Sequence, residues 1–247
     1  MGDEKLYNRF AAYYDKIYRN VDYTGESEFI RFAAKKHKSS PGIELLDMAC
    51  GTGSHAEMLI NYFNVTGMDL NEDMLELARQ KVPKVNFILG DMKDLKLEAD
   101  FDVITCIFSA IHYNKNYCEL EKTLRNFYTH LKDGGILIYD LSLNTSNWIE
   151  GLVSVDTVVE DRLKLARICQ SKLENGIFNA DFVFLIKANG KFDFDIDSHE
   201  LGVFNIKEVQ RIMKKVGFDT FVYADFTREI WEDGEAKRPV FVGVKNQ

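Results

Sequence analysis

The stretch LLDMACGTGS, residues 45–54, decides how the rest of the chain is interpreted. Its apolar run ends at Leu46, an aspartate follows at Asp47, and small residues continue to Gly53. This order predicts a buried strand that ends in a turn, where glycines let the backbone come close to a ligand. A helix that begins near Ser54 would point its free N–H groups toward the same place.

Outside this stretch, short apolar runs alternate with segments of helical spacing. Strands that alternate with helices indicate a parallel sheet covered by helices on both faces, so we expect an α/β fold with a doubly wound sheet. The predicted strands are residues 43–48, 65–69, 85–89, 101–108, 136–141, 218–226 and 239–244. The predicted helices are residues 4–19, 26–37, 54–63, 72–81, 117–131 and 206–216.

Residues 145–203 break the alternation and predict an antiparallel β insertion. The Asn189-Gly190 pair is typical of a two-residue hairpin turn. In the strand that follows, apolar residues alternate with aspartates, which indicates a half-buried strand. The aspartates have neither the glycine nor the glutamate of a calcium loop, so we expect them on the solvated face. They are Asp193, Asp195 and Asp197.

Composition excludes several classes of protein. The net charge of −8 over 247 residues argues against a nucleic-acid partner, because the phosphate backbone binds basic surfaces. No run of ~18 apolar residues predicts a membrane span, and the polar N-terminus is unlike a signal peptide, so we expect a cytoplasmic location. The four cysteines have no CxxC spacing, and we expect neither a disulfide framework nor a metal site.

The glycine loop is expected to bind a nucleoside. Asp69 ends the next predicted strand, 22 residues after Asp47, and a carboxylate there can accept hydrogen bonds from ribose hydroxyls. A nucleotide phosphate loop would need a lysine after Gly51, and none follows. The looser dinucleotide pattern is satisfied by residues 51–56, so NAD stays open. S-adenosylmethionine, which carries no phosphate but has an amino-acid end, suits a loop preceded by an acid.

Four features occur together in order. They are Asp47-x-Ala-Cys-Gly-Thr-Gly, Asp69 at the end of the second strand, Gly90-Asp91-Met92 after the third, and Phe101-Asp102 opening the fourth. The set resembles class I S-adenosylmethionine-dependent methyltransferases, which have a seven-stranded Rossmann-like sheet with an antiparallel last strand. The resemblance implies that Asp69 holds the ribose, that Asp91 binds the adenine amino group and that Met92 flanks its ring. It places the other cofactor contacts at Asp47, Ala49, Cys50, Gly51, Gly53, Leu70, Ile107 and Phe108.

A narrower resemblance covers LLDMACGTGSH, GDMKDL, FDVITCIFSAIHY and the terminal FVGV. These segments are similar to the sugar N,N-dimethyltransferases of antibiotic deoxysugar pathways, which methylate the amine of a nucleotide-linked amino sugar. The resemblance implies that Tyr7 approaches the substrate amine and that Tyr14 contacts the cofactor. His112 follows the fourth strand, where an imidazole could take a proton from the attacking amine or orient it. Tyr7 and His112 are therefore the candidate catalytic residues.

The sequence thus predicts an S-adenosylmethionine-dependent methyltransferase that acts on a small-molecule amine, an amino sugar or a similar compound. A nicotinamide-dependent oxidoreductase and a non-catalytic S-adenosylmethionine-binding protein are the alternatives. We expect N-terminal helices in residues 1–40 to cap the cofactor site, and residues 41–144 and 204–247 to form the core. The insertion at 145–203 is expected to be a lid or a contact in a homodimer.

Overall fold

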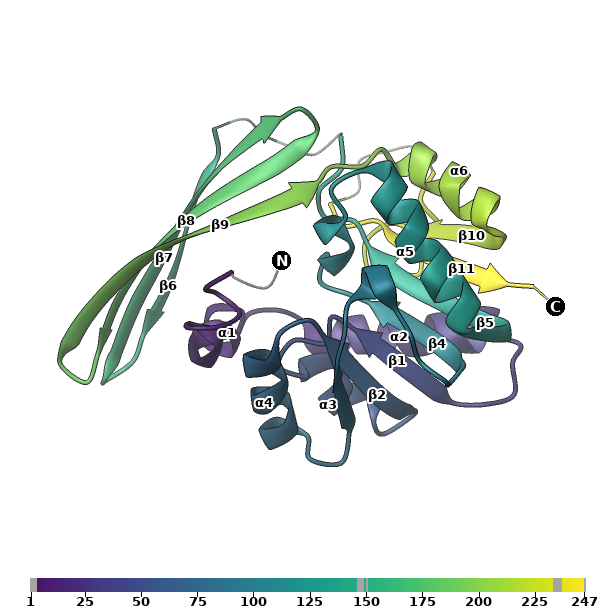
Figure 1. The fold of residues 1–247 in the computed structure, drawn as a ribbon, viewed down its shortest axis with the longest axis horizontal. Coiled ribbons are helices and arrows are strands. Elements are labelled where there is room, and N and C mark those ends of the chain that lie inside the picture. Colours follow the sequence, from purple (N-terminus) through teal and green to yellow (C-terminus); the bar gives the residue numbers. More distant parts are fainter. Residues whose placement is uncertain (1–3, 146–148, 150, 233–236, 247) are drawn as a thin grey trace.

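A seven-stranded sheet between two layers of helices forms the body of the protein, and a long four-stranded sheet projects beside it (Figure 1). The computed structural model describes residues 4–145, 149, 151–232 and 237–246. The seven strands lie in the order β10 (Phe218–Tyr223), β11 (Val240–Lys245), β5 (Leu131–Asp140), β4 (Phe101–Cys106), β1 (Glu44–Met48), β2 (Asn64–Asp69) and β3 (Asn86–Leu89).

The directions of these strands confirm the predicted Rossmann-like methyltransferase sheet. β1 pairs in parallel with β2 and β4, and β2–β3 and β4–β5 are parallel as well. β11 is the last strand of the chain and runs antiparallel to both β5 and β10. The parallel strands therefore all end at one edge of the sheet, where ligands of α/β folds bind.

Helices bury both faces of this sheet because successive residues of each strand point to opposite sides. Leu45 of β1 packs with α2 (Tyr23–His37) and α3 (Ser54–Leu59), whereas Leu46 belongs to the core under α5 (Tyr117–His130) and α6 (Ile206–Val216). α4 (Glu72–Lys81) packs against β2 and β3. No helix in the described ranges is long and apolar enough to cross a membrane.

The second sheet confirms the predicted antiparallel insertion. Its strands β6, β7, β8 and β9 lie in chain order and are joined by hairpins. The predicted turn at Asn189-Gly190 connects β8 to β9, and both of its residues have positive φ, as a type I′ turn requires. The strands are β6 (Val153–Val159), β7 (Leu163–Glu174), β8 (Ile177–Ala188) and β9 (Lys191–Gly202).

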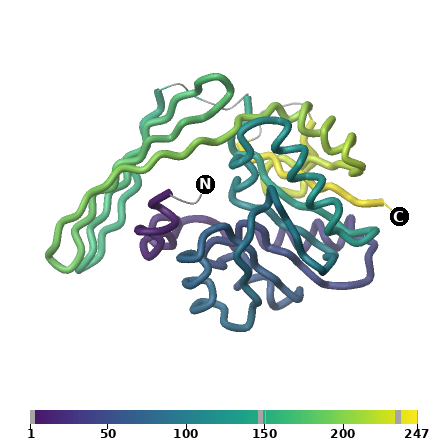
Figure 2. The backbone as a smooth tube through the Cα atoms, in the orientation of Figure 1, coloured from purple at the N-terminus to yellow at the C-terminus, as the bar shows by residue number. Residues whose placement is uncertain are grey.

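The N-terminal segment lies between the two sheets, and this changes which side of β9 is covered (Figure 2). The predicted helix over residues 4–19 shortens to α1 (Ala11–Ile17), and residues 4–10 form turns ahead of it. Lys5 pairs with Asp195 at 2.5 Å, and Arg9 pairs with Asp193 at 2.6 Å and with Asp195.

The prediction that the aspartates of β9 face solvent is wrong for Asp197, which is buried, and for Asp195, whose side chain is 16% exposed, whereas Asp193 is exposed as expected. Their alternation with apolar residues is also as expected. The aspartates face the N-terminal segment, whose cations pair with two of them. The apolar residues between them are on the open side instead, with exposed fractions of 67% for Phe192, 65% for Phe194 and 67% for Ile196.

Candidate active site

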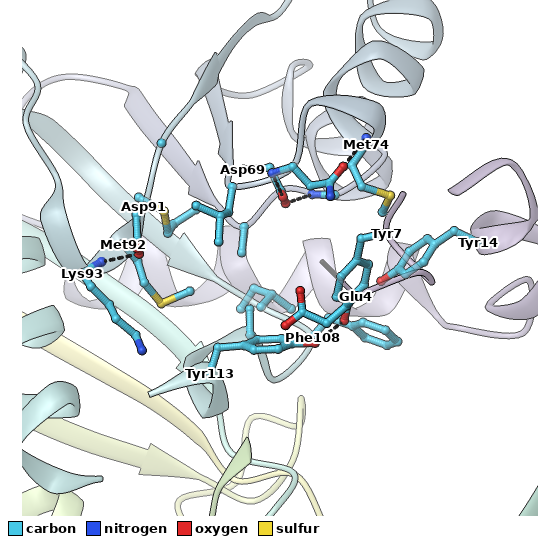
Figure 3. Close-up of a pocket in the computed structure, with 18 residues that line it drawn as sticks. Glu4, Tyr7, Tyr14, Asp69, Met74, Asp91, Met92, Lys93, Phe108 and Tyr113 are labelled. Carbon is cyan, nitrogen blue, oxygen red and sulfur yellow. Dashed lines mark hydrogen bonds between the residues drawn. The ribbon is translucent and has the colours of Figure 1, made fainter. Parts of the chain in front are cut away.

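A cleft lies at the carboxyl edge of the seven-stranded sheet, where the ends of β1, β2, β3 and β4 meet (Figure 3). It contains about 850 Å³ of space between its walls, part of it open to solvent. A smaller hollow next to it, lined by Asp47, Cys50 and His55, shares the walls formed by Gly51 and Phe108.

The glycine loop holds its shape through left-handed backbone conformations. Gly51 has φ of +54° and lines the cleft, so its backbone is open to a ligand. The Gly51 N–H donates to Asp69 Oδ2 at 2.8 Å, which ties the loop to the end of β2. Gly53, with φ of +77°, is absent from the lining of the cleft and of the smaller hollow. A Cβ there would lie 3.1 Å from the Phe87 ring, so the glycine serves the packing of the turn.

Asp47 has a buried oxygen with no partner. Its Oδ1 accepts a hydrogen bond from Thr105 Oγ1 at 2.9 Å, whereas Oδ2 has no hydrogen-bond partner within the described ranges. Burial raises the pKa of this carboxyl. A buried polar atom without a hydrogen-bond partner lowers the stability of the fold, and an ammonium group in the adjoining hollow would supply the missing hydrogen bond. The site therefore fits the amino-acid end of S-adenosylmethionine.

Asp69 sits farther along the same edge, with both oxygens already anchored. Oδ2 accepts from Gly51, and Oδ1 accepts from the Asn71 N–H at 3.0 Å. Burial raises the pKa of Asp69 even though these backbone hydrogen bonds lower it. Each carboxylate oxygen can accept more than one hydrogen bond, so the fixed group can still take the two hydroxyls of a ribose.

Asp91 and Met92 lie at one end of the cleft, and Tyr14 lies at the other (Figure 3). Asp91 Oδ1 accepts from the Lys93 N–H at 2.8 Å, which fixes the carboxylate at the rim. The apolar walls between these ends suit an aromatic base and its sugar, and they come from residues that sequence reasoning had assigned to the cofactor: Ala49, Leu70, Ile107 and Phe108.

α1 is attached to the glycine loop by Asp15, the residue after Tyr14. Asp15 accepts a hydrogen bond from Thr52 Oγ1 at 2.5 Å and pairs with Lys81 of α4 at 2.6 Å. These contacts hold Tyr14 over the cleft. The N-terminal segment is thus part of the wall, and Glu4 and Tyr7 also line it.

Tyr7 reaches the cleft from this segment and meets a residue from the other side of the fold. Its hydroxyl oxygen lies 2.6 Å from the hydroxyl oxygen of Tyr113, and both side chains line the cleft (Figure 3). Tyr113 belongs to the short 3₁₀ helix η2 (Ala110–Tyr113) that follows β4. It was not among the residues assigned from the sequence.

His112, the other candidate catalytic residue, is placed differently from the expectation. It is fully buried and is absent from the lining of the cleft. Its Nδ1 lies 2.8 Å from the Gly202 carbonyl oxygen, and its Nε2 accepts from the Leu143 N–H at 3.2 Å. Both ring nitrogens are therefore used, and the ring stacks on Phe204. This imidazole fastens η2 to the end of β9 and has no free nitrogen to offer an amine.

The histidine behind the cleft is His199 of β9, which is not among the residues assigned from the sequence. Its Nδ1 lies 2.8 Å from Tyr113 Oη, and its Nε2 lies 3.0 Å from Asp197 Oδ2. The one signal for this arrangement in the sequence is that Tyr113 directly follows the histidine that had been singled out. Its partners lie more than 80 positions away, so spacing alone could not identify them.

Comparison with known proteins agrees with this geometry. Residues 45–135 match the model of a methyltransferase domain. The chain is 31% identical to the dTDP-3-amino-3,4,6-trideoxy-alpha-D-glucopyranose N,N-dimethyltransferase of Streptomyces venezuelae over 238 aligned residues. This alignment covers 95% of this chain and 97% of that relative. The chain belongs to the S-adenosylmethionine-dependent methyltransferases. S-adenosylmethionine is accordingly the cofactor of this methyltransferase, and the alternative of a nicotinamide-dependent oxidoreductase is set aside.

Solved structures show the same relationship. The methyltransferase aligns with Streptomyces venezuelae DesVI at a TM-score of 0.84 and 30% identity, over 95% of this chain and 98% of that one. It aligns with the sugar N-methyltransferase KedS8 from Streptoalloteichus at a TM-score of 0.83 and 25% identity, over 95% and 93% of the two chains. The S-adenosylmethionine-bound aminopentose methyltransferase CalS10 from Micromonospora echinaspora aligns at 0.75 and 26% identity, over 91% and 90%.

Proposed function

We propose that this methyltransferase transfers the methyl group of S-adenosylmethionine to the amine nitrogen of a small molecule, an amino sugar carried on a nucleotide. The observation that carries the proposal is the pair of hydrogen-bonded hydroxyls, Tyr7 and Tyr113, in the wall of the cofactor cleft. An amine must present its lone pair to the methyl group, and hydroxyl oxygens beside it can hold its N–H groups. Two relatives that each cover 95% of this chain support an amine acceptor, since their names specify amino sugars.

The cofactor would be held by the residues whose geometry is given above. When bound, S-adenosylmethionine supplies a methyl group activated by a positive sulfur. Asp47 would accept from its ammonium group, Asp69 from its ribose and Asp91 from its adenine amino group. Tyr14 would cover the end of the cleft nearest the glycine loop. The remaining contacts would be made by Ala49, Cys50, Gly51, Leu70, Met92, Ile107 and Phe108.

The protein's own contribution to the reaction is alignment and the management of a proton. Glu4 and Tyr7 belong to a segment that ion pairs hold against β9, so they can close over a substrate beside the cofactor. That closure would exclude water and fix the nitrogen in line with the methyl group, which is the main requirement of a displacement at carbon.

We also propose a homodimer formed through the open face of the four-stranded sheet. This face carries large apolar side chains that are more than half exposed, and such patches on a soluble surface mark contact sites. A second copy would bring an identical apolar face. The exposed residues are Val153, Val155, Val159, Phe192, Phe194 and Ile196. We place the protein in the cytoplasm, because S-adenosylmethionine is made and used inside cells.

The function is tested with S-adenosylmethionine labelled in its methyl group. The protein is incubated with dTDP-linked amino sugars that carry the amine at C3 or C4, and the label is followed by mass spectrometry. The proposal expects label in at least one amino sugar. Calorimetric binding of S-adenosylmethionine with no label in any of these amines would instead favour the non-catalytic binding protein.

A further inference from the structure

Four side chains form a continuous line of hydrogen bonds from the core of the four-stranded sheet to the cleft. Asp197 Oδ2 lies 3.0 Å from His199 Nε2, and His199 Nδ1 lies 2.8 Å from Tyr113 Oη. Tyr113 Oη lies 2.6 Å from Tyr7 Oη. Asp197 and His199 are buried, at 8% and 4% exposure, while the tyrosines line the cleft. Three separate parts of the chain contribute to this line: the N-terminal segment, η2 and β9.

The buried end of the line accepts hydrogen bonds. Burial would raise the pKa of Asp197, but the hydrogen bonds from His199 and from the Leu6 N–H outweigh it, so the pKa lies below its ordinary range. The ionised carboxylate has no hydrogen to give. Its Oδ2 also accepts from the Leu6 N–H at 2.9 Å, and its Oδ1 accepts from the Ser198 N–H at 3.0 Å.

This acceptor fixes the direction of every other bond in the line. A neutral imidazole carries hydrogen on one nitrogen, so donation from His199 Nε2 to Asp197 makes Nδ1 an acceptor. Tyr113 therefore donates its single hydroxyl hydrogen to His199. With that hydrogen used, Tyr113 can only accept from Tyr7, and Tyr7 must donate to Tyr113. The line thus ends in the cleft with the lone pairs of the Tyr7 oxygen.

We infer that Asp197, His199 and Tyr113 are positioning residues that make the Tyr7 oxygen a hydrogen-bond acceptor for the N–H of the acceptor amine. This inference rests on the proposed function, since it concerns how the amine is held. An amine whose N–H groups are taken up by Tyr7 has its lone pair free for the methyl carbon. The Tyr7 oxygen has no hydrogen left to donate to a lone pair of the substrate. It therefore favours a substrate nitrogen that still carries hydrogen.

The same line can remove a proton from an amine that arrives as an ammonium ion. The N–H bond of the ammonium breaks as its proton moves to Tyr7, the Tyr7 hydrogen moves to Tyr113, and the Tyr113 hydrogen moves to His199 Nδ1. The balance is one N–H bond lost on the substrate and one gained on the imidazole, whose new positive charge faces Asp197. Burial raises the pKa of both Tyr7 and Tyr113 well above the ordinary value. Both tyrosines therefore stay protonated before and after the transfer, and each acts only as a relay for the proton.

The first test reads the direction of the line without any substrate. Nitrogen-15 NMR of the protein with labelled histidine distinguishes a protonated ring nitrogen from a bare one, and the signal missing in His199→Gln assigns this residue. The inference expects hydrogen on Nε2 and none on Nδ1 in the unmodified protein. Hydrogen on Nδ1 in the unmodified protein, alone or together with Nε2, would overturn the inference.

The second test measures what this direction does for the reaction. Asp197→Asn is compared with Asp181→Asn, which alters an exposed aspartate of β8 that accepts a hydrogen bond from Ser198 Oγ, outside both the line and the N-terminal segment. With a dTDP-linked 3-amino sugar, we expect Asp197→Asn to lower kcat by ~100-fold, the lower range for losing a positioned proton acceptor. The calorimetric affinity for S-adenosylmethionine should stay within about twofold. Equal kcat values for the two variants would overturn the inference.

A third variant tests whether the four residues act as one unit. Tyr7→Phe should lower kcat about as much as Asp197→Asn, and the double variant should be little worse than either, because groups in one line are not additive. Multiplying effects would contradict a common role. If the unmodified protein methylates no amine at all, the proposed function fails, whereas the NMR result still decides whether the line has the stated direction.

Discussion

His112 gives a prediction that separates a structural histidine from a catalytic one. Its Nδ1–H donates to the Gly202 carbonyl oxygen and its Nε2 accepts from the Leu143 N–H, so the ring is neutral and fully used. Burial lowers its pKa to about 4, although the hydrogen bond to Gly202 acts in the other direction. A proton on Nε2 would place two N–H groups against each other. The folded protein therefore resists protonation here.

The effect on stability follows from the difference between folded and unfolded states. As pH falls below 6.5, the unfolded chain protonates His112 while the folded protein does not until about pH 4. The unfolded state then binds more protons, so stability is lost as pH falls through this window. A difference of about 2.5 pKa units corresponds to roughly 3 kcal/mol.

The assay is urea unfolding of the unmodified protein and of His112→Gln at pH 7 and pH 4. Gln keeps one donor and one acceptor but does not titrate. The unmodified protein should lose about 3 kcal/mol more than the variant between the two pH values. At pH 7 the turnover of the variant should fall no more than its folded fraction does. Equal pH dependence of unfolding in the two proteins, or a folded variant with lost turnover, would refute the structural role.

Three further predictions follow from the site and the surface. Asp69→Ala removes a carboxylate that holds Gly51 and that we propose binds the ribose, so calorimetry should show S-adenosylmethionine bound about 10- to 100-fold more weakly; an unchanged Kd would exclude the ribose contact. Phe194→Asp puts a charge on the open face of the four-stranded sheet and should give a monomer in light scattering, whereas a monomeric unmodified protein would remove the proposed dimer. Arg9→Ala loosens the N-terminal segment and should speed hydrogen exchange at residues 4–10, and unchanged exchange would show that the ion pairs contribute little.

The core of the fold was predictable because its signals are local. An apolar run before Asp47 and the glycines after it identify the end of β1, and the regular alternation that follows leaves one sheet topology. The cofactor side of the site follows from the same cause. Asp69 is the last residue of β2 and Asp91 lies two residues after the end of β3, so the parallel sheet brings both to one edge.

The side of the cleft that we propose binds the substrate was not predictable, because it depends on contacts between distant segments. Alternation in β9 shows which residues share a face but not which face is covered. Lys5 settles that by pairing with Asp195, 190 positions away. Likewise, the sequence shows that His112 follows β4, but it does not show whether the side chain points into the cleft or into the core.

Two residues with left-handed backbone, Phe108 and Ser109, turn the chain after β4. The 3₁₀ helix that follows points neighbouring side chains in different directions, because it has three residues per turn. Tyr113 therefore enters the cleft, and His112 points into the core.

The measurement that tests the central claim most directly compares two acceptors that differ in one atom. S-adenosylmethionine with a labelled methyl group is supplied together with dTDP-linked 3-amino-3,4,6-trideoxyglucose or with its counterpart that carries a hydroxyl at C3. The account predicts labelled methyl on the nitrogen of the first sugar, located by fragment masses, and none on the second. Label on the hydroxyl sugar, or on a carbon or oxygen of the amino sugar, would contradict it.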